Sequence, residues 1–260
     1  MKQLQFGLKI GFDDTQYAKD IIRLYLENKL HYIELFVKPD CNVLNIEYWK
    51  DLEIPIVIHS PHSGVNVNFA SKKSREANKK ILELLQIIND KLLPKYIVFH
   101  GGVNGSIEET MEQLFDFTHI NHNCLIENKP AITKNNLFPI GATYDEVEEL
   151  LENLNCDFCF DIGHAICAAN YFKLKKVSSF VYKFLELKPK MFHIADCYCN
   201  SIYDNHDNFG NGRLFIDFPF ILDIIPDDYM ITIETHNDKD SLNLFEKDVN
   251  YLCSKLDYSK

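Results

Sequence analysis

The sequence has no apolar run long enough to cross a bilayer, which takes about 20 consecutive residues in a helix. It also has no low-complexity linker and no internal sequence repeat. With 260 residues and 46% hydrophobic content, the chain can bury one large core. We therefore expect a single domain over residues 1–260, in a soluble, cytoplasmic protein that has no membrane partner.

Basic residues are scarce, and a disulfide pattern is absent. Lysine and arginine total 27 against 38 acidic residues, and the net charge of -11 weighs against indiscriminate binding of nucleic acid. The eight cysteines include the close pairs Cys156/Cys159 and Cys197/Cys199, but neither pair has a second Cys/His pair at zinc-finger spacing. We interpret the cysteines as small buried thiols in a reducing compartment.

Six short apolar runs end on residue types that bind metals, and these end residues are His59, His100, Glu127, Asp161, His193 and Glu234. A single ending of this kind is a weak signal, but six of them call for one explanation. Parallel strands arranged in a ring aim the residues at their carboxyl ends toward a common centre. Helical patterns alternate with these runs along the chain, which favours an α/β fold of the (β/α)8 barrel type over a doubly wound sheet.

Two further segments add candidate ligands. His164 follows Asp161 by three residues, so both would lie at the carboxyl end of one strand, and residues 165–171 would then form a loop at the barrel mouth. Asp204 and His206 share a face if their segment is extended. Together the candidates are five histidines and four carboxylates, a donor set that suits zinc and also manganese or iron. Nine donors exceed the needs of one ion and predict a cluster of two or three ions bridged by carboxylates.

These residues resemble the site of endonuclease IV (AP endonuclease family 2) and of the wider xylose isomerase-like TIM barrel superfamily. The matching motifs are Phe99-His100, Ile126-Glu-Asn128, Asp161-x-x-His-Ala165, His193-x-x-Asp196, Asp204-x-His206 followed by Gly210-x-Gly212, and Glu234. The resemblance covers nearly the whole chain and implies the xylose isomerase-like barrel. It implies a trinuclear zinc site with the ligands His59, His100, Glu127, Asp161, His164, His193, Asp204, His206 and Glu234.

The resemblance to endonuclease IV implies a metal-dependent hydrolase of a phosphodiester or phosphomonoester. Glu127, Asp161 and Glu234 would then be catalytic, with Glu127 bridging metal ions and orienting the attacking water. The endonuclease probes its duplex with an arginine-bearing loop after strand two and a tyrosine-containing segment after strand three. The corresponding stretches, Val37–Cys41 and Ser60–Asn68, show neither feature. Abasic-site DNA is thus a candidate substrate that neither the loops nor the net charge support.

The superfamily also implies an alternative, because related sugar isomerases and epimerases generally need only a single-metal subset of these ligands. That subset corresponds to Glu127, Asp161, His193 and Glu234. One Mn2+, Co2+ or Mg2+ ion would replace the zinc cluster, and Glu127 and Glu234 would act as an acid/base pair on a sugar or sugar phosphate. A non-catalytic protein that binds a metal or a sugar phosphate is a third reading, which we rank last.

Other residues are expected to support the site. Either His59 or His62 is the strand-three ligand: His59 has the strand-end position, which we favour, and His62 has the spacing of a family ligand. Asn128, next to Glu127, is expected beside the metals or the substrate. Asp196 is a candidate for a carboxylate that orients a histidine ligand. Arg213 is a candidate for holding a phosphate, although a surface position explains it equally well.

Overall fold

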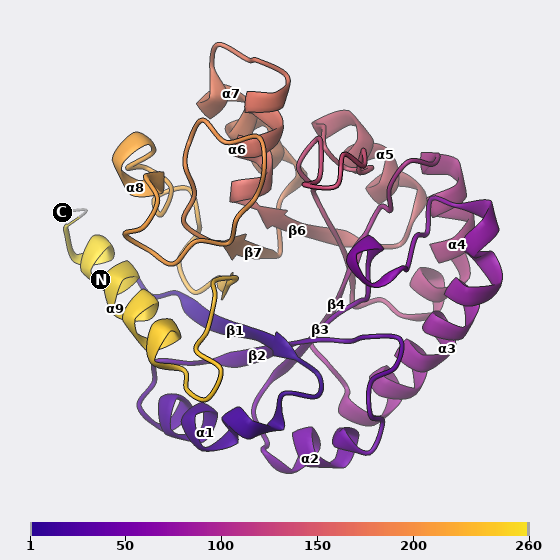
Figure 1. The fold of residues 1–260 in the computed structure, drawn as a ribbon, viewed down its shortest axis with the longest axis horizontal. Helices are drawn as coiled ribbons and strands as arrows, with labels where there is room; N and C mark the ends of the chain where they lie inside the picture. The colour runs from indigo at the N-terminus through magenta and orange to yellow at the C-terminus, as the bar shows by residue number, and fades with distance from the viewer. Residues whose placement is uncertain (1, 259–260) are drawn as a thin grey trace.

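The computed structural model describes residues 2–258, in which eight parallel strands form a closed barrel in the order β1 to β8. Figure 1 shows the helices as an outer ring around the strands. This architecture confirms the (β/α)8 barrel expected from the sequence. Met1 and residues 259–260, the ends of the expected 1–260 domain, lie outside the described residues. Within residues 2–258, no helix has the length and apolar character needed to cross a bilayer.

The strands coincide with the apolar runs, because parallel strands that are covered on both faces are rich in Val, Ile, Leu and Phe. Their bounds are β1 (Gln5–Gly11), β2 (Tyr32–Phe36), β3 (Ile56–His59), β4 (Tyr96–His100), β5 (Cys124–Glu127), β6 (Asp157–Asp161), β7 (Met191–Ile194) and β8 (Met230–Ile233). Each strand pairs with the next one along the chain, and β8 pairs with β1.

Helices connect successive strands, and several of them begin at capping side chains. Ser106 accepts the backbone N–H of Glu109 before α4, and Thr143 forms a capping box with Glu146 before α5. The helix bounds are α1 (Ala18–Leu26), α2 (Asn45–Asp51), α3 (Arg75–Leu92), α4 (Ile107–Ile120), α5 (Tyr144–Asn153), α6 (Ile162–Tyr171), α7 (Val177–Phe184), α8 (Leu214–Asp217) and α9 (Asn243–Tyr258). Short 3-10 turns are η1 (Thr15–Tyr17), η2 (Ser63–Val65), η3 (Lys72–Ser74) and η4 (Leu185–Leu187).

Residues 165–171 are part of α6, so the loop expected for them from the sequence is wrong. The helix begins at Asp161, whose Oδ1 accepts the backbone N–H of His164 at 2.7 Å. Residues 162–169 are all buried, with α7 packed against the helix. A helix that is apolar on every side lacks the polar face that marks a surface helix in a sequence.

Side chains inside the barrel lie in layers, because every second residue of a strand points to the same face. An apolar layer consists of Tyr32, Val57, Val98, Leu125, Cys159, Met191 and Met230. Gly7 leaves room for the Tyr32 ring, since a Cβ on Gly7 would lie 2.1 Å from a ring carbon. The residues two positions further along the eight strands are Lys9, Glu34, His59, His100, Glu127, Asp161, His193 and Thr232. A layer of polar and charged groups therefore lies directly above the apolar one.

Candidate metal centre

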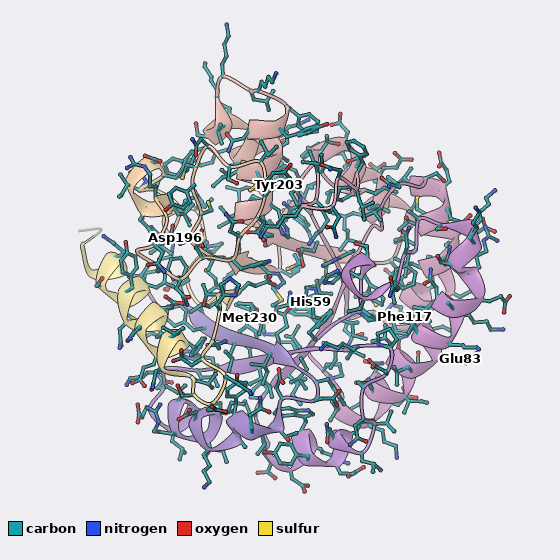
Figure 2. All side chains as sticks on the ribbon, in the orientation of Figure 1. His59, Glu83, Phe117, Asp196, Tyr203 and Met230 are labelled. Atoms are coloured by element: carbon teal, nitrogen blue, oxygen red, sulfur yellow. The ribbon has the colours of Figure 1, made fainter. Side chains whose placement is uncertain are left out.

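The nine predicted ligands lie at the carboxyl ends of the strands or in the segments that follow them. Strand register pairs His100 with Glu127 and Asp161 with His193. Figure 2 labels His59 near the centre of the ring of strands. Exposure is at most 7% for His59, His100, Glu127, Asp161, His164, His193 and Glu234. The barrel thus buries seven polar side chains in one place, which requires that they satisfy one another or a bound ion.

The first group of donor atoms comes from β3, β4 and β5. The Nε2 atoms of His59 and His100 lie 3.0 Å apart, and Glu127 Oε2 lies 3.1 Å from His100 Nε2 and 3.9 Å from His59 Nε2. Donors held at about 2.0–2.1 Å by one tetrahedral zinc ion are separated by roughly 3.3 Å. The spacing of these three atoms therefore suits a single ion.

The second group surrounds His193. Its Nδ1 lies 2.6 Å from Glu234 Oε1 and 3.3 Å from Glu127 Oε2. This nitrogen is buried, and within residues 2–258 no well-aligned hydrogen bond satisfies it. Burial raises the pKa of Asp161 to about 6, and the carboxylates of Asp204 and Glu127 add to the shift. Crowded carboxylates around a buried imidazole nitrogen fit a cation site, because a bound cation would relieve the repulsion among them.

The third group, Asp204 with His164 and His206, lies beside the other two. Asp204 Oδ2 is buried and lies 2.8 Å from His206 Nε2 and 3.3 Å from His164 Nε2, but in the described chain neither contact has the alignment of a hydrogen bond. The backbone φ of His206 is 54°, a left-handed conformation that is unfavourable for a residue other than glycine. The fold therefore holds His206 beside Asp204 at a conformational cost.

Glu34, which was not predicted, holds two of the histidines. Its Oε1 lies 2.6 Å from His59 Nδ1, and its Oε2 lies 3.1 Å from His193 Nε2 and accepts the Thr232 hydroxyl at 2.6 Å. Burial by itself would raise the pKa of Glu34, but His193 and His59 lower it to about 2. An ionised Glu34 accepts protons only, so it fixes a hydrogen on His59 Nδ1 and on His193 Nε2. The other ring nitrogen of each histidine is then free to bind a metal.

Two lysines, also not predicted, lie against the ligand carboxylates. Lys9 Nζ is 2.7 Å from Glu234 Oε1 and 3.2 Å from His59 Nε2, and Lys129 Nζ is 2.9 Å from Glu127 Oε1. Burial by itself would lower the pKa of Lys9, but Glu234 and the other carboxylates raise it, so Lys9 is a cation. The signal for Glu34 and Lys9 in the sequence is a charged residue inside an otherwise apolar strand.

Both candidate strand-three ligands lie beside His100. The His62 ring stacks on the His100 ring with centroids 4.7 Å apart, and ring nitrogens of His59, His62 and His100 all lie within 4.8 Å of one another. His59 is fully buried, whereas His62 lines a cavity at the mouth. Burial lowers the pKa of His62 to about 2, so it is neutral. We retain both histidines as candidate ligands.

Asp196 binds backbone amides, and in the part of the chain that the structure describes it forms no hydrogen bond or ion pair with a histidine. Its Oδ1 accepts the N–H groups of Cys197 and Leu214, each at 2.9 Å, and its Oδ2 accepts those of Gly210 at 2.8 Å and Gly212 at 2.9 Å. A Cβ on Gly212 would lie 2.6 Å from Asp196 Oδ1, which explains the glycine at that position. Asp196 therefore shapes the segment that carries Asp204 and His206, and Figure 2 labels it on the side of α8 and α9.

The remaining two predicted residues are also engaged with the protein. Asn128 joins β5 to β6, since its side chain donates to the carbonyl of Asp161 and accepts the N–H of Asp161, both at 2.8 Å. Arg213 forms an ion pair with Asp217 at 3.0 Å, and its side chain is 53% exposed. Arg213 is not among the residues that line the mouth cavity.

Solved structures with similar folds include an epimerase-like protein and an endonuclease by name. A D-tagatose 3-epimerase-like protein is 22% identical, with a TM-score of 0.70, and the match covers 99% of this chain and 98% of the other. Endonuclease IV from Thermus thermophilus is 17% identical, with a TM-score of 0.63 and coverage of 98% and 100%. A second Thermus thermophilus protein, from a crystal soaked with ZnCl2, is 17% identical, with a TM-score of 0.66 and coverage of 98% and 99%.

A family model provides the assignment that these distant structures do not. A search of curated proteins finds no match. The model described as "Xylose isomerase-like TIM barrel" matches residues 46–255, which is most of the chain and includes all nine predicted ligands. The closed parallel barrel and the ligands at its strand ends agree with that match. The chain belongs to the xylose isomerase-like TIM barrel family.

Proposed function

We propose that the protein is a metal-dependent phosphoester hydrolase whose centre holds a cluster of two or three zinc ions. The observation that carries this proposal is the third group, Asp204 with His164 and His206, assembled beside the inner ligands. A single-metal isomerase does not need this group. The similarity in fold to endonuclease IV, and to a protein soaked with ZnCl2, supports the same reading.

The carboxylate of Glu127 is placed between the groups of candidate ligands and is therefore suited to bridge two metal ions. Its Oε2 faces His100 and His193, and its Oε1 lies 3.0 Å from His164 Nδ1 and 2.9 Å from Lys129 Nζ. When bound, zinc ions would supply a water of lowered pKa and positive charge for the phosphoryl oxygens. We assign the binding of that cluster to the nine predicted ligands, with His62 as the alternative to His59.

The residues around the candidate ligands have two roles: Glu34 orients histidines, and Lys9 and Lys129 neutralise charge. Glu34 keeps the protons of His59 and His193 on the ring nitrogens that face away from the cluster, which leaves the other nitrogens as donors. Lys9 and Lys129 offset part of the negative charge of the buried carboxylates. Both lysines therefore lower the cost of keeping those carboxylates ionised in the absence of metal.

The mouth favours a small phosphoester over duplex DNA. The segment after β3 folds into the 3-10 turn η2, whose N-cap His62 accepts the N–H of Gly64 at 3.1 Å. Arg213 is paired with Asp217, and the chain carries a net charge of -11. Neither the paired Arg213 nor the acidic net charge favours binding of the phosphates of a duplex.

Metal content tests the proposal. Protein purified without added metal or chelator is analysed by elemental mass spectrometry and assayed with bis(p-nitrophenyl) phosphate. We expect two or three zinc ions per chain and metal-dependent hydrolysis. The variant His206→Ala should lose zinc from the third group, whereas His122→Ala, which changes an exposed histidine outside the centre, should keep the full content. A single tightly bound ion in the wild-type protein would overturn the cluster.

A single-metal sugar isomerase or epimerase is the alternative, because its ligand subset is equally complete. Glu127, Asp161, His193 and Glu234 are all buried at the strand ends, and a D-tagatose 3-epimerase-like protein shares the fold. One equivalent of manganese, cobalt or magnesium, together with turnover of free sugars and no phosphate release, would favour this reading. The elemental analysis that tests the hydrolase therefore also decides between the two.

A further inference from the structure

A cavity of about 270 Å³ lies beside the candidate metal centre. His62, His100, His164 and Asp204 are the lining residues that belong to the centre. Most of the other lining residues are apolar, and they include Val67, Phe69, Val103, Ile132, Leu137 and Pro139. The polar or charged ones are Ser63, Lys129, Thr133, Lys134 and Asn135. The cavity therefore has one end that faces candidate metal ligands and a body whose wall is mostly, though not entirely, apolar.

Three segments build this cavity, and hydrogen bonds fix them to one another. Asn68, in the segment after β3, donates to the Val103 carbonyl at 2.8 Å and accepts the Val103 N–H at 2.9 Å. Val103, in the segment after β4, forms a β-bridge with Pro139, and Gly102 accepts the N–H of Ile140 at 3.0 Å. The walls are thus held in place in the protein without any ligand, as expected of a preformed binding site.

We infer that the substrate is a small molecule that joins a metal-binding oxygen head to a compact apolar body, and that the body occupies this cavity. An apolar cavity of about 150 Å³ holds benzene, so the volume here suits a body of about one ring. A polynucleotide does not fit a cavity of this size. The inference rests on the proposed metal centre and adds a preference for aryl or branched alkyl phosphoesters.

Leu137 and Phe138 offer a matched pair of positions to test the apolar wall. They are adjacent in the segment after β5, but Leu137 lines the cavity, whereas Phe138 does not and is 53% exposed. The backbone of both residues is held by hydrogen bonds that do not involve their side chains, from Leu137 N–H to Thr133 and from Phe138 N–H to Asn104. The variants Leu137→Asn and Phe138→Asn therefore change the same chemistry inside and outside the cavity.

The test measures binding of two hydroxamates to the zinc-loaded full chain by calorimetry. Benzohydroxamate and acetohydroxamate share a metal-chelating head and differ in a phenyl or a methyl group. We expect the wild-type protein to bind benzohydroxamate at least about tenfold more tightly, because the phenyl group buries more apolar surface. Leu137→Asn should remove most of that preference, and Phe138→Asn should keep it.

Equal affinities for the two hydroxamates, or the same preference in both variants, would overturn the inference. Absence of binding by both would overturn the metal centre on which the inference rests. Thermal unfolding of each variant establishes that it is folded. Hydroxamates report on the cavity whatever reaction the centre performs. Loss of the proposed hydrolase activity in the phosphodiester assay is therefore distinguishable from failure of the apolar cavity.

Discussion

Replacing Glu34 with glutamine should weaken zinc binding without emptying the site of its direct ligands. The carboxylate accepts three hydrogen bonds, from His59 at 2.6 Å, His193 at 3.1 Å and Thr232 at 2.6 Å. Glutamine has the same shape, but its amide nitrogen donates and does not accept. Glu34→Gln therefore places an N–H group against at least one partner that also presents a hydrogen.

The consequence depends on which oxygen the amide nitrogen replaces. In either orientation, one histidine carries its proton on the ring nitrogen that should bind the metal. At the Oε1 position, the amide forces the His59 proton onto Nε2, the atom that faces His100. At the Oε2 position, it forces the His193 proton onto Nδ1, the atom that faces Glu234. Loss of such a supporting carboxylate typically lowers metal affinity about 10- to 100-fold, which is about 1.4–2.7 kcal/mol of binding free energy.

Competition with a chromophoric chelator measures the zinc dissociation constant of the variant. Glu109→Gln is the control, because Glu109 is also buried and hydrogen-bonded but pairs with Arg75 and Gln113 outside the barrel. We expect the control to bind zinc as the wild-type protein does. A folded Glu34→Gln protein with unchanged zinc affinity would refute the role assigned to Glu34.

Three further predictions concern groups around the ligands. The variant Lys9→Met should bind zinc more tightly, because the Lys9 ammonium competes with zinc for Glu234. Without metal, the variant should unfold at a lower temperature, because Glu234 loses its ion pair with Lys9. Weaker zinc binding would contradict this prediction. The variant Asp196→Asn should lower the free energy of unfolding by about 1–3 kcal/mol and reduce the zinc content, since the segment that carries His206 loses backbone hydrogen bonds. Denaturant titration measures the free energy of unfolding, and elemental analysis measures the zinc content. Burial by itself would lower the pKa of His164, but neighbouring carboxylates raise it to about 10. Zinc must therefore displace a proton from His164, and the affinity of the protein for zinc should rise between about pH 6 and about pH 9. Calorimetry in buffers of different protonation enthalpy checks the proton release, and a pH-independent affinity would argue against it.

The residues at the strand ends were predictable because an apolar run that stops at a polar residue indicates both the strand and its carboxyl end. An apolar run marks a buried strand, and the polar residue that stops it marks the carboxyl end, where parallel strands of a barrel present their side chains. His59, His100, Glu127 and Asp161 are the last residues of their strands in the structure. The expected loop at residues 165–171 was wrong because a fully buried helix has no polar face to reveal it.

The sequence by itself determined the barrel class and which metal-binding residue types stand at the strand ends, because both follow from local hydrophobic patterning. Only the tertiary structure decided that Glu34 and Lys9 face the inside, since alternate residues of a strand become interior or exterior when the sheet closes. The same holds for the segment after β7, where Asp196 accepts N–H groups up to 18 residues away and thereby shapes the segment that carries Asp204. Such long-range contacts have no local signal in the sequence, because they depend on which distant segments the fold brings together.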